Sequence, residues 1–263
     1  ISAGADPLPV HLKVDTGMHR VGCSPAEATR LVATVAAHEE LVLDGVLTHL
    51  AVADEIDHPY NGRQLAAFDA VLERLRARGL RPRVVHAANS AAALVLPDAR
   101  YDMVRCGIAV YGVPPAAPIA EVVPLQPALA VKARVSYVQR LAAHEALSYG
   151  LRYRLAQDAW VATVPIGYAD GIPRNLGAAG GEVIVGGRRR RIAGAVTMDQ
   201  LMVDLGDVPA QPGDEVVLLG RQGEQTITAQ EIADRLGTIA YEVVCGIGPR
   251  VPRRYRHESG GTS

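Results

Sequence analysis

The stretch Val10-His-Leu-Lys-Val-Asp-Thr-Gly-Met-His-Arg-Val-Gly22, followed by Ser24-Pro-Ala-Glu27, decides the fold of this chain. It predicts a buried strand over Val10–Val14, a polar turn, and a helix with Ser24 as its N-cap. The same order recurs along the first part of the chain. Strands are expected over Leu41–Leu47 and Arg83–Ala87, and again from Val104 to Tyr111, with helices over Asn61–Arg78 and Ser90–Leu96. Strands that alternate with helices indicate parallel βα units, and such folds hold ligands at one rim of the sheet.

The pattern changes after the proline-rich link Val113–Pro118. Short β runs separated by turn residues follow at Ala130–Val138, Trp160–Pro165, Glu182–Val185, Ile192–Val196, Leu201–Asp204 and Glu215–Leu219. A capping box at Thr228–Glu231 predicts one short helix, and a last strand is expected at Tyr241–Cys245. We therefore expect two domains, residues 1–118 of the βα type and residues 119–263 mainly of β type.

Composition narrows the class of protein. The chain has 263 residues, a formal charge of −1, 49% hydrophobic and 21% charged residues, which is ample for a buried core and argues against disorder or general nucleic-acid binding. The sequence contains no apolar run of membrane-span length, and Ile1–Pro7 has no basic segment followed by an apolar one, so a soluble, unexported chain is expected. The run Arg188–Arg191 favours a solvated hairpin arm over a phosphate patch, and a polar, frayed tail is expected over Arg253–Ser263.

The three cysteines, Cys23, Cys106 and Cys245, are odd in number and far apart. Neither a disulfide framework nor a zinc site is indicated by this spacing. We expect them to be small buried apolar residues.

The densest polar cluster follows the first strand. Lys13 and Asp15 share one face of that strand, and Gly17 lets the chain turn before Arg20. Charges so close to apolar neighbours are costly unless they are paired. Two interpretations stay open: a structural ion pair, or a corner that binds an anion.

Other polar residues stand at or just after strand ends, namely His49, Asn89, Ser90 and Arg105. Ser90 is placed at a helix start, where free N–H groups attract a phosphate or a carboxylate, although any N-cap serine has the same pattern. Gly107 follows Arg105 and permits a second close approach of the backbone. Together they predict a phosphate-binding cup.

In the second half, polar clusters lie between strands at Ser148-Tyr149-Gly150, Gly167-Tyr168 and Thr197-Met198-Asp199-Gln200. A tyrosine acts as a base only where cations stabilise its phenolate. Cations are available, since the chain has 25 arginines and two lysines, Lys13 and Lys132. For each tyrosine taken alone, a structural role remains open.

Eight segments in order resemble the alanine racemase family: residues 13–22, 48–55, 86–90, 104–112, 147–150, 166–171, 198–200 and 250–253. The resemblance implies an incomplete (β/α)8 TIM-type barrel followed by a mainly β C-terminal domain. It further implies a cytoplasmic, pyridoxal-phosphate-dependent isomerase that interconverts L- and D-alanine for cell-wall peptidoglycan. The expected assembly is a homodimer with shared active sites.

The resemblance also implies roles for cofactor-binding residues. Arg105 matches the arginine that faces the pyridine nitrogen, and Ser90 with the backbone of Gly107 and Ile108 matches the phosphate cup. His49 matches a residue that bridges the arginines beneath the ring. Arg20 matches an arginine near the cofactor's phenolic oxygen and the catalytic tyrosine, and it is also expected to bind the substrate. Lys13 matches a lysine that some members carbamylate to position that arginine.

The implied substrate residues lie in the second half. Tyr149 matches the catalytic tyrosine that moves the α-proton on one face of the substrate, supplied across the dimer interface. Met198 matches a residue whose backbone helps to bind the substrate carboxylate, with Asp199 beside it. Tyr168 and Arg174 match residues that line the entry channel. No metal ligands are implied.

Two departures limit the resemblance. The family's second base is a lysine that also forms the Schiff base, and neither Lys13 nor Lys132 has its context, so the early barrel units are expected to be absent and the 263 residues alone inactive. Pro249 stands where some members carry a tyrosine. Alternatives are a serine or broad-specificity racemase, a non-catalytic pyridoxal-phosphate-binding protein, or an interaction fragment with exposed strand edges.

Overall fold

The computed structural model describes residues 6–255, and the chain divides into two compact units, Ile1–Gln126 and Pro127–Ser263. The sequence pattern had suggested a division between residues 118 and 119. The end of the predicted polar tail, residues 256–263, and the start of the Ile1–Pro7 segment, residues 1–5, lie outside the described residues.

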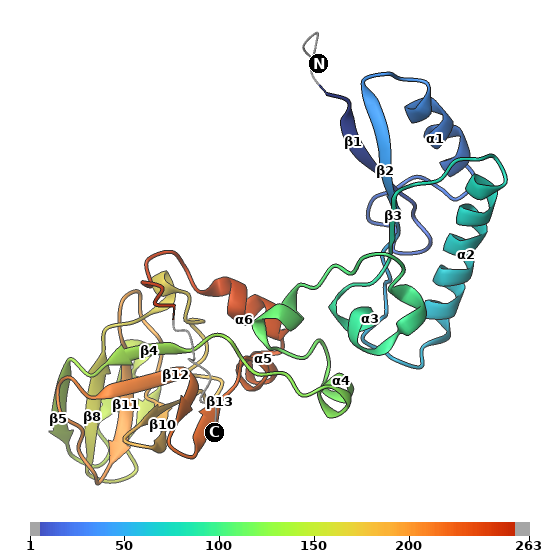
Figure 1. Cartoon of the computed structure of the whole chain (residues 1–263). Coiled ribbons are helices and arrows are strands. Elements are labelled where there is room, and N and C mark those ends of the chain that lie inside the picture. The colour runs from blue at the N-terminus through green and yellow to red at the C-terminus, as the bar shows by residue number, and fades with distance from the viewer. Residues whose placement is uncertain (1–5, 256–263) are drawn as a thin grey trace, which may run out of the picture. The chain divides into compact units, whose positions relative to one another are not determined.

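The first unit is built on a parallel three-stranded sheet in the order β1 (Leu8–Lys13), β2 (Leu41–Leu47), β3 (Val84–His86). The strands are in register at their carboxyl ends, where Lys13 pairs with Leu47 and Leu47 with His86. Helices α1 (Ala28–Ala36) and α2 (Pro59–Arg76) lie on one side of these strands (Figure 1). The predicted βα units are therefore present, and their strand ends meet at one edge.

One apolar cluster holds the helices against the sheet. Val32 of α1 and Phe68 of α2 are fully buried against Val46 of β2. The helical spacing of Phe68, Val71, Leu72 and Leu75 puts all four on the face of α2 that the core covers. Burial of such side chains stabilises a fold by about 1.5–3 kcal/mol each, which fixes α2 firmly beneath the loops that follow β1 and β2.

The rest of this unit consists of short helices: α3 (Ser90–Val95), 3₁₀ turns η1 (Pro97–Ala99) and η2 (Ile108–Tyr111), and α4 (Ala117–Val122). The strand expected from Val104 to Tyr111 is wrong. Arg105 donates one backbone hydrogen bond to Ala88, at 3.0 Å, but the chain then turns into η2, which ends at Gly112 in the left-handed region at φ 70°. The β-branched residues suggested a strand, whereas glycine conformations redirect the chain.

The first helix also begins later than predicted. The Ser24 and Glu27 side chains do form their reciprocal hydrogen bonds, but the backbone N–H of Glu27 donates to the Ser24 carbonyl at 3.1 Å. This bond spans three residues and closes a tight turn, so regular α-helix starts only at Ala28.

The second unit is a mainly β domain. Its eight-stranded antiparallel sheet has the order β13-β12-β9-β10-β11-β8-β5, with β4 paired to β12. The strands are β4 (Val131–Arg134), β5 (Tyr137–Leu141), β8 (Ala159–Val164), β9 (Glu182–Val185), β10 (Arg188–Ile192), β11 (Leu201–Gly206), β12 (Glu215–Gln222) and β13 (Gln225–Ile227). A separate ribbon pairs β6 (Ala146–Leu147) with β7 (Tyr153–Arg154).

The arginine run forms β10, which pairs with β9 across the Gly186–Gly187 turn. Arg188 and Arg191 are exposed, as expected for a hairpin arm, whereas Arg189 donates to Glu231 at 2.6 Å and to Glu182 at 3.1 Å. The strand predicted at Ile192–Val196 is thus shifted toward the N-terminus. Long arginine stems cover the apolar sheet while their charges reach carboxylates, so they fit a strand that hydrophobicity alone misses.

The C-terminal helices partly agree with the sequence. Helix α5 (Ala229–Leu236) begins at the predicted cap, where the Thr228 hydroxyl accepts from the Glu231 N–H at 3.0 Å. The last strand expected at Tyr241–Cys245 is wrong, because this segment is helix α6 (Ala240–Gly246). Ala240 and Val243 are buried while the residues between them are exposed, which is helical spacing rather than strand alternation.

The interpretation of the cysteines as small buried residues is also wrong for two of them. Cys106 and Cys245 are exposed and Cys23 is partly exposed, and all three are free thiols. Among the described residues, no helix combines the length and the apolar character that a membrane span requires.

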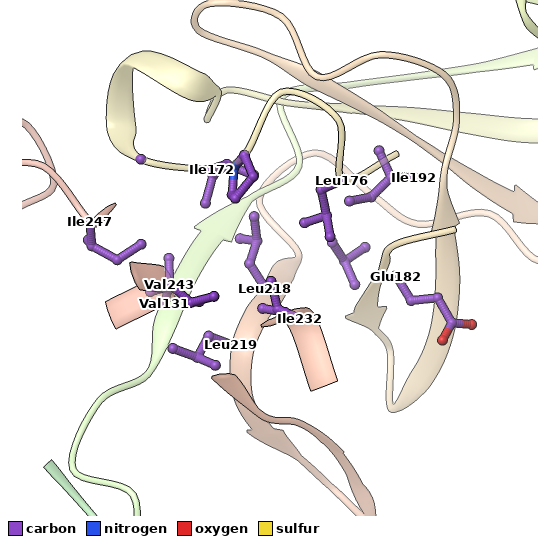
Figure 2. A pocket seen from close by; sticks show the side chains of 13 residues that line it. Val131, Ile172, Leu176, Glu182, Ile192, Leu218, Leu219, Ile232, Val243 and Ile247 are labelled. Atoms are coloured by element: carbon purple, nitrogen blue, oxygen red, sulfur yellow. The ribbon is translucent and has the colours of Figure 1, made fainter. Parts of the chain in front are cut away.

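A small cavity of about 20 Å³ lies in the second unit. Figure 2 shows it lined by aliphatic side chains from several elements, among them Leu218 of β12, Ile232 of α5 and Val243 of α6. Glu182 is the one charged residue among the lining residues. A cavity this small and apolar is a packing gap in the core and not a site for a polar ligand.

Candidate active site

Arg105 is the centre of a polar cluster at the carboxyl ends of β2 and β3. Its Nη2 group donates to the Thr48 carbonyl at 2.9 Å, to the Ala87 carbonyl at 2.9 Å and to His49 Nδ1 at 3.0 Å. Its Nη1 group donates to His86 Nδ1 at 2.6 Å. These acceptors fix the plane of a half-buried guanidinium without placing a carboxylate against it.

A guanidinium only donates hydrogen bonds, so its partners determine the protonation of the neighbouring imidazoles. His86 accepts at Nδ1, and its Nε2 proton then points to His11 Nδ1, 2.9 Å away. His11 in turn donates from Nε2 to Asp44 at 3.2 Å, and Asp44 also accepts two bonds from Arg83. The result is a directed chain, Arg105 to His86 to His11 to Asp44.

Burial and charge keep the two imidazoles beside Arg105 neutral. Burial, Arg105 and His11 lower the pKa of His86 to about 4. Burial is also the largest cause for His49, where Arg105, Arg20 and Lys13 help to lower the pKa to about 4. The pKa of Lys13 itself is lowered, first by burial and then by Arg20 and Arg105. This edge of the sheet is therefore positive and suited to an anion.

The turn after β1 shows how the charges at Lys13, Asp15 and Arg20 are arranged. The Asp15 carboxylate accepts from the backbone N–H groups of Gly17 and His19, each at 3.0 Å, and these bonds lower its pKa. Within residues 6–255, neither Lys13 nor Arg20 has an ion-pair partner. The carboxylate therefore shapes the turn, and the positive charges beside it remain available to a ligand.

Ser90 and Gly107 form the core of the predicted anion cup. Ser90 is buried, begins α3, and its Oγ accepts the Gly107 N–H at 2.8 Å and the Ala109 N–H at 3.4 Å. The N-cap of α3 is Asn89, whose side chain accepts from Ala92 at 3.0 Å, so the Ser90 hydroxyl does not have to cap the helix. Its proton is free to donate to an anion at this strand end. Ile108, the third residue assigned to the cup, is itself buried, and its backbone begins η2.

In the second unit, Tyr149 stands at the tip of the β6–β7 ribbon with 76% of its surface exposed. Three of its neighbours have positive φ: Ser148 at 64°, Gly150 at 77° and Leu151 at 50°. Such angles are strained for Ser and Leu, and strain of this kind gathers at functional positions. The Ser148 hydroxyl donates to the Ala195 carbonyl at 2.9 Å and ties the tip to the neighbouring loop.

An open cleft of about 540 Å³ brings Tyr149 together with Tyr168, Arg174, Met198 and Asp199. The two segments behind it are joined by backbone bonds from Tyr168 to Thr197 and from Ala169 to Met198, both at 3.0 Å. A Cβ on Gly167 would lie 2.3 Å from the Met198 carbonyl oxygen, so only glycine allows this approach.

The Asp199 carboxylate accepts a hydrogen bond from Arg250 Nη2 at 2.8 Å. Arg250 also pairs with the buried Asp170 at 3.4 Å. The sequence patterns included Arg250, His11 and His86 in quoted segments but gave them no role, and they did not single out Gln64. Histidines on a strand and a glutamine on a helix carry no pattern that reveals their partners.

The site residues predicted from the sequence are divided between the two units. The first unit gathers Lys13, Arg20, His49, Ser90, Arg105, Gly107 and Ile108, and the second gathers Tyr149, Tyr168, Arg174, Met198 and Asp199. A parallel βα unit with the predicted anion cup, followed by a β unit with a tyrosine-lined cleft, defines a two-domain protein of the α/β-plus-β class.

Comparison with known proteins gives the family. Residues 2–115 match the family model described as alanine racemase, N-terminal domain, and residues 128–255 match the model described as alanine racemase, C-terminal domain. An alanine racemase of Symbiobacterium thermophilum is 51% identical over 251 residues, which cover 95% of this chain and 66% of that protein. One from Carboxydothermus hydrogenoformans is 46% identical, with 93% and 67% covered.

Solved structures agree. The alanine racemase from D-cycloserine-producing Streptomyces lavendulae matches with a TM-score of 0.89 at 44% identity, covering 95% of this chain and 67% of that one. The Bacillus anthracis alanine racemase with bound L-Ala-P matches with a TM-score of 0.90 at 38% identity, covering 98% and 67%. The chain belongs to the alanine racemase family, and it spans 66% of the Symbiobacterium relative's length. The predicted fold, a partial barrel followed by a mainly β domain, is confirmed.

Proposed function

We propose that the protein carrying this chain is an alanine racemase that interconverts L- and D-alanine with pyridoxal 5'-phosphate. The observation that carries the proposal is the position of Arg105. Its guanidinium is fixed by two neutral imidazoles and two carbonyls. Ser90, shortly after β3, accepts the Gly107 N–H at 2.8 Å and forms the cup with it. Within the proposal, the product D-alanine supplies cell-wall peptidoglycan, and the reaction takes place in the cytoplasm.

The residues of the first unit fit this cofactor. A phosphate needs N–H and O–H donors, and the Ser90 hydroxyl and the Ile108 N–H can supply them. The Gly107 N–H donates to Ser90 Oγ at 2.8 Å and would turn from it toward a bound phosphate. A pyridine nitrogen needs a donor if it is unprotonated, and the always-charged Arg105 provides one. When bound, pyridoxal phosphate would withdraw electrons from the α-carbon of the amino acid and so acidify its α-proton.

Each residue of the first unit then has a task. Arg105 would donate to the ring nitrogen and so keep it unprotonated, which would limit electron withdrawal and favour return of the proton over transamination. His49, neutral and hydrogen-bonded to Arg105, would keep that guanidinium in place for the cofactor ring. Arg20 orients the phenolic oxygen and the substrate, and Lys13 supports Arg20.

The second unit supplies the proton carrier. Tyr149 would hold or remove the α-proton on one face of the substrate, and a neighbouring arginine would stabilise its phenolate. The backbone of Met198, with Asp199 beside it, would bind the substrate carboxylate, and Tyr168 and Arg174 would line the entry channel. The exposure of Tyr149 and Leu151 supports a homodimer in which a second copy covers this tip.

We further propose that the 263 residues alone do not racemise alanine, because the sequence offers no lysine for the second proton carrier. Lys132 lies on β4 and pairs with Glu215 at 3.0 Å, and Lys13 ends β1. Neither lysine takes that role in the proposal.

The experiment is a racemase assay of the full-length protein encoded by the gene, with added pyridoxal phosphate. L-Alanine should be converted to D-alanine, while the 263-residue chain should show no turnover under the same conditions. Absence of interconversion by the full-length protein would refute the proposed function. Normal turnover by the 263-residue chain would refute the proposal that the reaction needs a lysine outside this chain.

A second candidate, a serine or broad-specificity racemase, is favoured by Pro249, which stands where the family resemblance implies a tyrosine in some members. Rates measured side by side on alanine, serine and a basic amino acid distinguish the two. A non-catalytic carrier of pyridoxal phosphate would bind the cofactor without any of these turnovers, and Tyr149 and its cleft would then have no task.

A further inference from the structure

Gln64 is a fully buried amide in the middle of α2, close to the candidate site. Its Nε2 group donates to the His49 carbonyl at 3.0 Å and to Thr16 Oγ1 at 3.4 Å. Its Oε1 atom accepts from the Ala51 N–H at 2.8 Å. Both ends of a costly buried amide are therefore satisfied, and the partners come from the loops that follow β1 and β2.

The two loops are also joined directly to each other. Thr16 Oγ1 and Thr48 Oγ1 are 2.7 Å apart, and Thr48 is fully buried. The Thr48 carbonyl and the His49 ring both accept from Arg105, so residues 48–51 contact Arg105 on one side and Gln64 on the other. A displacement of this segment at Gln64 must reach the guanidinium, because His49 itself contacts Gln64 through its carbonyl and Arg105 through its ring.

Asn61 shows that the loop has a second anchor. This residue lies one turn earlier on α2, is also buried, and donates from Nδ2 to the Val52 and Glu55 carbonyls, each at 3.1 Å. The outer part of the loop is therefore held without Gln64. What Gln64 adds is the position of residues 49–51, which include the imidazole beside Arg105.

We propose that Gln64 is a positioning residue that holds the His49 ring against the Arg105 guanidinium. The proposal rests on the proposed function for its meaning, since it concerns the same candidate cofactor site. Without the amide, the His49 carbonyl and the Ala51 N–H lose their buried partner, and the segment must shift to find others. The His49 ring then leaves the guanidinium.

The test compares Gln64→Met with Asn61→Leu in the 263-residue chain. Both substitutions replace a buried amide of the same helix by an apolar side chain of similar size. The measurement is NMR titration of the His49 ring, together with detection of the ring nitrogen that carries the proton. The charges that face this ring are Arg105, Arg20 and Lys13, so its titration reports its distance from them.

In the unmodified chain the proton should reside on Nε2 and titrate well below the range of a free histidine. In Gln64→Met the His49 pKa should rise by about one unit or more, and the proton should be shared between both nitrogens. In Asn61→Leu the ring should titrate as in the unmodified chain. An unchanged His49 in Gln64→Met, or an equal change in both variants, would overturn the proposal.

Gln64→Asn keeps the experiment decisive if Gln64→Met fails to fold. It retains a buried amide but is one methylene too short to reach the His49 carbonyl and the Ala51 N–H together. The His49 titration should shift in the same direction, and an unchanged titration would count against the proposal. The measurement needs neither cofactor nor substrate, so its failure and a failure of the racemase assay can be told apart.

Discussion

The guanidinium of Arg105 donates to the Nδ1 atom of His86 at 2.6 Å, so a permanent positive charge rests on a neutral imidazole and not on a carboxylate. The carboxylate that ends this hydrogen-bonded chain, Asp44, lies two imidazoles away. A carboxylate in direct contact would neutralise Arg105. The histidine chain instead fixes the orientation of the guanidinium and leaves its charge for a ligand.

The first prediction concerns pH. The pKa values of His86 and His49 are about 4 in the folded state, below the value of 6.5 expected for an unfolded histidine. The unfolded state thus binds more protons between these values, so the free energy of unfolding of the first unit should fall as pH decreases from 6.5 to 4. The loss is at most roughly 3 kcal/mol per histidine, since one pKa unit corresponds to ~1.4 kcal/mol.

Tryptophan fluorescence cannot follow unfolding of the first unit, because the only tryptophan, Trp160, belongs to the second unit. Histidine NMR signals, recorded at a series of pH values, can follow it. His86→Asn should reduce the slope of stability against pH, whereas the exposed His38→Asn should not. A stability that stays constant from pH 6.5 to 4 would contradict the proposed neutral imidazoles.

The second prediction concerns the shape of Arg105. A lysine at this position cannot donate to His86, His49, Thr48 and Ala87 together, because it lacks the planar fork of a guanidinium. Arg105→Lys in the full-length protein should lower kcat/KM for alanine by roughly 10–100-fold, the effect of losing one or two charge-assisted hydrogen bonds. The exposed Arg81→Lys serves as control, and equal rates in all three proteins would exclude Arg105 from the site.

The third prediction concerns the anion cup. Ser90→Ala removes a hydroxyl that accepts from Gly107 and has a proton left for a phosphate. Affinity for pyridoxal phosphate should fall roughly 10–100-fold, while affinity for pyridoxal, which lacks the phosphate, should stay nearly constant. Absorbance titrations of the full-length protein with both compounds measure this. An equal loss for both would place Ser90 outside the phosphate site.

The sequence allowed more of the fold than of the site to be predicted. Helix α2 and strand β9 could be predicted because apolar spacing and turn residues are local features of the sequence. The α6 helix was missed because valines at 243 and 244 have strand propensity. Packing of α6 against α5, with Ala240 and Val243 buried, overrides that propensity. Propensity is a weak force compared with tertiary packing.

Some residues of the candidate site could likewise be predicted from the sequence, and others could not. Ser90 could be proposed because it comes shortly after strand β3 and begins helix α3, and Arg105 because Gly107 follows it closely; local patterns reveal both positions. His11 and Gln64 could not, because their partners His86 and His49 are far away in the sequence. Contacts of this kind depend on the register of β1, β2 and β3, which no local pattern specifies.

The fourth prediction concerns Tyr149. Tyr149→Phe removes the phenol at the ribbon tip and should slow proton transfer on one face of the substrate by roughly 10²-fold or more in the full-length protein. Exchange of the α-proton with solvent deuterium, measured separately from L- and D-alanine, should fall strongly from one enantiomer. Tyr137→Phe, on the exposed strand β5, is the control. Unchanged exchange from both enantiomers would remove Tyr149 from the mechanism.

The last prediction concerns the core of the second unit, which supports the Tyr149 cleft. Leu218 is buried on β12 and lines the small cavity in Figure 2. Leu218→Ala would enlarge that cavity and should lower the free energy of unfolding by about 2–5 kcal/mol. Trp160 lies on β8 of the same sheet, so its fluorescence during urea unfolding reports this unit. The exposed Val208→Ala should change stability by less than about 0.5 kcal/mol. Similar losses in both variants would mean that Leu218 is not packed as described.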